Sequence, residues 1–63
     1  MNLPLKVPTY VSAMAEIQEI SLAIDVPVYL FRVNEGGYVI DTQAEVYSNE
    51  TLIIKLFAGE RQD

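Results

Sequence analysis

Carboxylates are the most numerous ionisable side chains in this sequence. Its 63 residues include nine Asp and Glu but no histidine and no cysteine, so the usual general base, imidazole metal ligand and thiolate nucleophile are all missing. A catalytic carboxyl group usually has its pKa raised by burial in an apolar pocket, and a chain this short has little surface with which to build one. We therefore expect that the protein is not an enzyme.

Glu16 and Glu19 have the most suggestive spacing, because they lie three residues apart on an expected helix. They could contact a hard cation, but a calcium loop needs more oxygen ligands at fixed spacing, and a solvated helix face explains them as well. Gly36-Gly37 lacks the Lys-Ser/Thr of a P-loop and the spacing of a dinucleotide fingerprint. We expect no metal site and no cofactor, and we keep the two glutamates as secondary candidates for an interaction.

The acidic balance of the chain limits its partners. A net charge of −5 repels phosphate, and the four cationic side chains are scattered along the sequence, so direct nucleic-acid binding is not expected. No apolar run reaches the length of a membrane span, and the first eight residues lack the basic and apolar regions of a secretory signal. The expected location is the cytoplasm, without membrane contact.

One helix is predicted over residues 9–24, where good helix formers predominate. Its apolar residues recur at steps of three or four and form one stripe: Tyr10, Met14, Ile17, Ile20 and Ile24. Residues 20–26 also alternate as a strand would, and this alternative stays open. Prolines at positions 4 and 8 make residues 1–8 an extended arm, which could pair as an edge strand with its own sheet or a neighbour's.

Three strands are predicted after the helix. The segment 28–33 is rich in β-branched and aromatic residues, Asn34 to Gly37 suits a hairpin loop, and further strands follow over 38–46 and 51–58. Residues 59–63 are expected to be a frayed tail. The predicted fold is α+β: a single domain, 1–63, in which one N-terminal helix packs on a three-stranded antiparallel β-meander (28–58) as a two-layer sandwich.

The two faces of this sheet are predicted by placing Val33 opposite Tyr38, which turns Phe31 and Ile40 toward the helix. The opposite face is then unusually apolar for a solvated one, and it is our candidate interaction face: Val28, Leu30, Val39, Asp41, Ile53 and Phe57. Tyr47, at a turn, is a further secondary candidate. In the alternative interpretation, the arm of residues 1–8 folds back over the candidate interaction face, or the strand register differs and these apolar residues are scattered.

These features together predict a small acidic, non-catalytic protein-binding module that inhibits or adapts a larger protein and acts as a homodimer. In size and charge it is similar to short phage or mobile-element proteins that block host enzymes. Two alternatives are a structural or assembly subunit, in which the arm pairs with a neighbouring sheet, and an acidic mimic of nucleic acid that blocks a nucleic-acid-binding protein.

Overall fold

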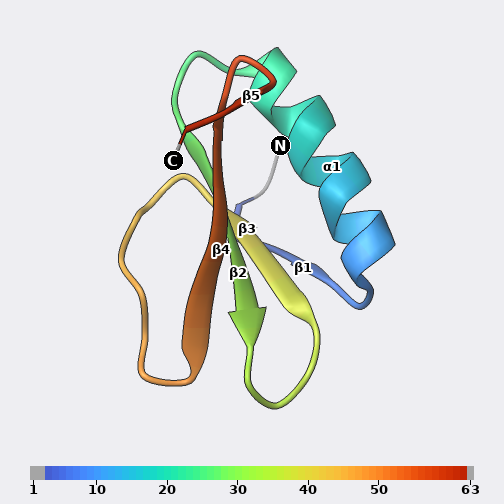
Figure 1. Ribbon diagram of the computed structural model, residues 1–63, viewed down its shortest axis with the longest axis vertical. Coiled ribbons are helices and arrows are strands. Elements are labelled where there is room, and N and C mark those ends of the chain that lie inside the picture. Colours follow the sequence, from blue (N-terminus) through green and yellow to red (C-terminus); the bar gives the residue numbers. More distant parts are fainter. Residues whose placement is uncertain (1–2, 63) are drawn as a thin grey trace.

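The structure is a computed structural model that describes residues 3–62 as one helix packed on one face of a five-stranded antiparallel sheet (Figure 1). The predicted α+β class, with an N-terminal helix on an antiparallel sheet, is confirmed. The elements in chain order are β1 (Leu5–Val7), α1 (Tyr10–Ala23), β2 (Val28–Val33), β3 (Tyr38–Asp41), β4 (Glu50–Phe57) and β5 (Glu60–Arg61).

Helix α1 lies within the predicted range because local residues define both its start and its end. At the start, the Thr9 hydroxyl accepts a hydrogen bond from the backbone N–H of Ser12 at 3.2 Å, as an N-cap does. At the end, Ile24 is already extended, and Pro27 disfavours helical geometry at the residue before it. The alternative of a strand over residues 20–26 is therefore wrong.

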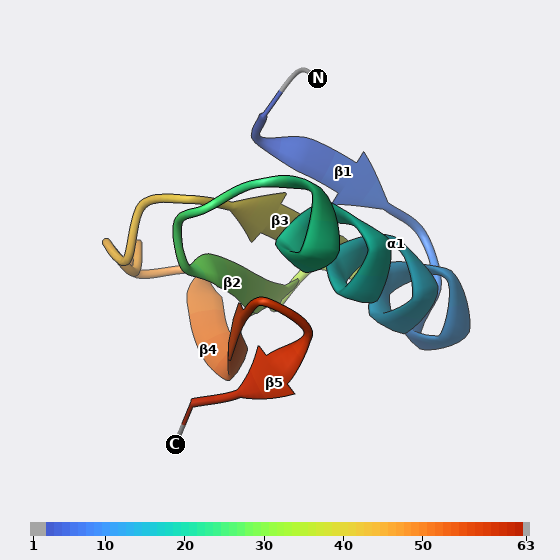
Figure 2. The ribbon, with the colours of Figure 1, turned by 90° about the horizontal axis from the view of Figure 1, so that it is seen from above.

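The three predicted strands exist, but they do not form a simple meander. The strand order is β1-β3-β2-β4-β5, so β2 lies between β3 and β4 and pairs antiparallel with both. Strands β3 and β4 therefore run in the same direction, and the chain must return along the sheet to join them. The segment 42–49, predicted in part as strand, makes this return on the side of the sheet opposite α1 (Figure 2).

Two short strands extend the sheet at its edges. The arm forms β1 and pairs with its own β3, with Lys6 opposite Val39; residues 1–2 lie outside the described part of the chain. The tail is not frayed throughout, since Glu60 and Arg61 pair with the end of β4. Asp63 also lies outside the described residues. Both edge strands are only two or three residues long, which limits pairing with other chains.

The β2–β3 register differs from the predicted one by a single residue. The N–H of Val33 donates to the carbonyl of Gly37 at 3.1 Å, and Arg32 lies opposite Tyr38. Gly37 is therefore part of the pairing, and the loop contains three residues rather than four. Because side chains alternate along a strand, this one-residue shift turns each β2 side chain to the opposite face of the sheet relative to β3.

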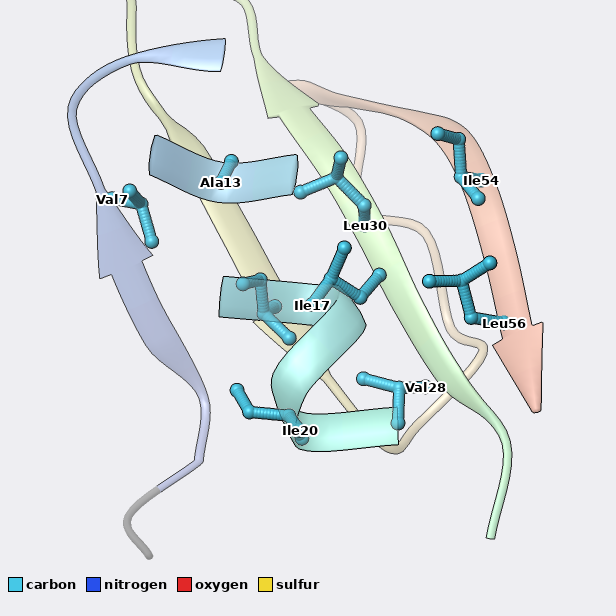
Figure 3. Packing of buried hydrophobic residues seen from close by; sticks show 9 residues of the cluster. Val7, Ala13, Ile17, Ile20, Val28, Leu30, Ile54 and Leu56 are labelled. Atoms are coloured by element: carbon cyan, nitrogen blue, oxygen red, sulfur yellow. The ribbon is translucent and has the colours of Figure 1, made fainter. Parts of the chain in front are cut away.

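The core lies between α1 and the side of the sheet formed by alternate residues of β2 and β4 (Figure 3). Val28 and Leu30 are fully buried here, and Ile17 of the helix packs over them. A β-bulge in β4 leaves Ile53 without a partner between the pairs Leu30–Ile54 and Phe31–Leu52. The buried cluster comprises Val7, Ala13, Ile17, Ile20, Val28, Leu30, Ile40, Ile54 and Leu56.

The turn between β4 and β5 is fastened to the helix by polar contacts. Ala58 and Gly59 both have positive φ, 52° and 81°, as in a two-residue type I′ hairpin turn. The Gly59 N–H donates to the buried Ser21 hydroxyl at 3.1 Å, and its carbonyl accepts from the Gln18 amide at 3.2 Å. The Ser21 hydroxyl in turn donates to the Gln18 carbonyl at 2.9 Å. These contacts hold β5 and the end of β4 beside the helix.

Candidate functional site

The side of the sheet that faces away from α1, called here the outer face, carries an aromatic strip along β2. The rings of Tyr29 and Phe31 stack at 6.4 Å between centroids and 25° between planes. In the neighbouring strands, Asp41 and Lys55 lie opposite Tyr29. The Lys55 ammonium lies 5.7 Å from the Tyr29 ring centroid, within the range of a cation–π contact. The outer face therefore combines two stacked aromatic rings with a cation over one of them.

Phe31 is only 2% exposed although it lies outside the cluster beneath the helix. Around it, residues of the segment 42–49 and of the sheet enclose a pocket of about 260 Å³. We call this the acidic pocket, because three of its eight lining residues are carboxylates and none is cationic. Its lining comprises Pro4, Phe31, Val39, Asp41, Gln43, Glu45, Tyr47 and Glu50. Helix α1 leaves the outer face uncovered. The segment 42–49, called here the crossover segment, covers only part of that face.

Hydrogen bonds at both ends of the crossover segment position the carboxylates of the acidic pocket. An oxygen of Asp41 accepts from the Thr42 N–H at 2.7 Å. An oxygen of Glu50 accepts from the Tyr47 N–H at 3.4 Å, and the Glu50 N–H donates to the Tyr47 carbonyl at 3.0 Å. An ionised carboxylate accepts several hydrogen bonds, so each of these groups keeps capacity for a ligand.

A second, larger hollow of about 490 Å³ lies toward the β2–β3 hairpin and shares Val39 with the acidic pocket. We call it the hairpin pocket. Its walls come from the end of β1, the hairpin loop and the start of β3: Lys6, Val7, Pro8, Val33, Glu35, Gly36, Gly37, Tyr38 and Val39. The two pockets share Val39, and each has charged residues in its lining.

The structure separates the residues of the predicted interaction face into two groups. The placement of Val28 and Leu30 on this face is wrong, because the shifted register buries both completely beneath the helix. Ile53, at the bulge, packs against the same core. Val39 and Asp41 line the acidic pocket and are half-buried. Phe57 is 41% exposed and follows Lys55 by two residues on β4, which places it on the outer face.

The secondary candidates lie on two different sides of the sheet. Tyr47 is exposed and lines the acidic pocket, so it joins Val39 and Asp41. Glu16 and Glu19 are exposed on α1, on the other side of the sheet. Within residues 3–62, no group of three or more Asp and Glu side chains is arranged as a metal site.

Sequence reasoning missed several residues of the acidic pocket and its surroundings. The predicted β2–β3 register turns Phe31 toward the helix, and unbroken alternation along the predicted strand 51–58 does the same for Leu52. Glu45 falls within the predicted strand 38–46. One signal was available: the segment 42–49 mixes polar residues with Val46 and Tyr47 and lacks the alternation of a good strand. That pattern favours an exposed connection, which is where these residues lie.

The helix carries a second set of exposed apolar residues, Val11, Ala15 and Leu22. Val11 is the most exposed of the large ones, at 80%. Leu22, however, lies against the β4–β5 turn: a Cβ added to Gly59 would meet its Cδ2 at 2.8 Å. Because Leu22 has this packing role and Val11 and Ala15 line neither the acidic pocket nor the hairpin pocket, the helix surface is the weaker candidate.

In the described part of the chain, α1 lacks the length and apolar character needed to cross a membrane. No protein-family model, curated protein or solved structure matches this chain, so its function is argued from its own geometry.

Proposed function

We propose that this protein is a non-catalytic protein-binding module that inhibits or adapts a larger protein through its outer face. The observation that carries this proposal is the pair of hollows that share Val39, one of which is lined by Phe31 and Tyr47. Aromatic side chains beside a desolvated floor are typical of residues that dominate binding energy at protein interfaces.

Exposed apolar residues of β4 and of the segment that leads into it support the same role. Val46, Tyr47, Leu52 and Phe57 are each between 41% and 60% exposed, and Tyr47 lines the acidic pocket. Exposed apolar surface that gathers in one region of a protein marks an interaction site more often than scattered residues do. The lack of histidine and cysteine further favours binding over catalysis.

A homodimer through the outer face is a second candidate, because Leu52 and Phe57 expose apolar surface on the same strand. Two copies would bring together two chains of charge −5, so their association should strengthen as salt screens the repulsion. Light scattering over a dilution series, at about 0.05 M and about 0.5 M NaCl, tests this candidate. A monomer at every concentration in both salts would contradict it.

The binding proposal is tested with a phage-displayed library of random dodecapeptides selected on the immobilised protein. We expect the selected peptides to lose binding to Leu52→Glu/Phe57→Glu and to keep it with Val11→Glu, a change of the same kind on the exposed helix surface. Circular dichroism checks that each variant stays folded. Loss of binding with Val11→Glu alone, or with neither variant, would contradict an outer-face site.

A further inference from the structure

We propose that the acidic pocket receives an arginine side chain from a basic segment of the protein partner. This inference rests on the proposed protein-binding function and adds the chemistry of the partner. It depends on three features of the pocket, namely its apolar floor, its carboxylates and its lack of a cation.

The composition of the pocket matches the two parts of a long basic side chain. Arginine and lysine have an apolar stem that packs on apolar surface while the charged head reaches polar groups. Above the buried Phe31, Pro4, Val39 and Tyr47 supply apolar surface for the stem. Asp41, Glu45 and Glu50 supply acceptors for the head. A purely apolar side chain would leave these carboxylates partly desolvated without a partner.

Arginine fits this pocket better than lysine. Its planar guanidinium donates paired hydrogen bonds to carboxylates and stacks on aromatic rings. The pocket offers both kinds of partner, since Tyr47 lines it beside the carboxylates. A metal ion is a poorer match, because the carboxylates of residues 3–62 nowhere gather in a metal-binding arrangement, whereas hydrogen bonds from a guanidinium can reach acceptors that lie further apart.

The surroundings of the pocket favour a foreign basic segment over nucleic acid or a second copy. Phosphates would meet three carboxylates here, with Glu35 in the neighbouring hairpin pocket. A second copy carries the same net charge of −5, so like charges would oppose its approach. A partner with an exposed arginine next to apolar residues can pack against the apolar lining of the pocket and can donate hydrogen bonds to its carboxylates.

The test uses the same dodecapeptide library and a pair of charge-matched variants. Glu45→Gln/Glu50→Gln removes two charges from the pocket but keeps the side-chain shape and the acceptor for the Tyr47 N–H. Glu16→Gln/Glu19→Gln removes two charges from the exposed helix surface, so the net charge is the same in both variants. Circular dichroism confirms that both stay folded, and synthetic peptides from the selection are titrated against each protein by calorimetry.

We expect the selected peptides to share an arginine flanked by apolar residues. Their affinity should fall about tenfold with Glu45→Gln/Glu50→Gln and less than about twofold with Glu16→Gln/Glu19→Gln. Replacing the peptide arginine by citrulline, which keeps the shape but not the charge, should cause a loss similar to that of the pocket variant. Raising NaCl from about 0.05 M to about 0.5 M should weaken binding.

The possible failures are distinguishable. Peptides without enriched arginine that still lose binding to Leu52→Glu/Phe57→Glu would overturn this inference and leave the outer-face site in place. Equal losses with the two charge-matched variants would also overturn it, because net charge rather than the pocket would then be responsible. Enrichment of lysine in place of arginine would overturn the arginine assignment. Peptides that ignore every outer-face substitution, or no enriched peptide, would overturn the proposed function as well.

Discussion

Replacing Leu30 and Leu52 by alanine, one at a time, tests which face of the sheet belongs to the core. Leu30 lies in the central strand with none of its surface exposed, whereas Leu52 in β4 is 43% exposed on the outer face. The sequence-based register placed the two leucines the other way round. The same change of residue type at both positions therefore separates the two registers.

The magnitudes follow from burial. Leu→Ala in a packed core costs about 2–5 kcal/mol, because the apolar contacts are lost and a cavity remains. A chain of 63 residues has a total free energy of unfolding of about 3–9 kcal/mol. Leu30→Ala should therefore remove a large part of the stability, leaving a partly unfolded protein at room temperature. Leu52→Ala should cost no more than about 1 kcal/mol, because its side chain is already partly in water.

Urea unfolding followed by far-ultraviolet circular dichroism and tyrosine fluorescence measures both values. Equal urea dependence of the free energy in the two variants would show that only stability has changed. The reasoning would be refuted if Leu52→Ala cost as much as Leu30→Ala or more, since the core would then lie on the other side of β2.

Four further expectations concern the ends of the helix and the β4–β5 turn, and urea unfolding checks each of them. Gly59→Ala should lower the free energy of unfolding by about 1–2 kcal/mol, because φ is +81° there and the new Cβ would meet Leu22. Ala58→Gly should raise it by a few tenths to about 1 kcal/mol, because φ is +52° at this residue, and an unchanged value would show that the turn is unstrained. Ser21→Ala should cost about 1–3 kcal/mol by removing the acceptor of the Gly59 N–H; a neutral effect would mean that water replaces the hydroxyl. Thr9→Ala should cost about 1 kcal/mol through loss of the N-cap, and no loss would contradict that role.

Local structure could be predicted from the sequence where one residue type leaves few choices. Thr9 as a helix cap and Pro27 as a helix stop are such residues, and the helix lies within one residue of its predicted bounds. Strand β2 runs from Val28 to Val33 as expected, since its β-branched and aromatic residues are followed at once by loop residues.

The strand order and register could not be predicted, because they depend on distant contacts and on one turn. Two consecutive glycines, Gly36 and Gly37, allow the hairpin to close in more than one way, and both have positive φ. The one-residue difference between the predicted and the observed β2–β3 register buries Val28 and Leu30 beneath the helix and turns Phe31 to the outer face. The bulge at Ile53 is likewise invisible in an alternating pattern.

The candidate site was predicted only in part for the same reason. Val39 and Asp41 lie on the predicted face because the register difference turns over the side chains of β2 and not those of β3. Phe57 lies on its predicted face because the bulge falls before it in β4. The acidic pocket itself forms only because the segment 42–49 crosses from β3 to β4 past β2. That path follows from the strand order, which pairing energies between remote segments decide.

The most direct test of the outer-face site is nuclear magnetic resonance of the ¹⁵N-labelled protein, titrated with one of the selected peptides. We expect the largest amide shifts on β2, β3, β4 and the segment 42–49, centred on Val39 and Tyr47, with the amides of α1 unmoved. Shifts concentrated on α1 around Val11 would contradict the account and would place the binding surface on the helix.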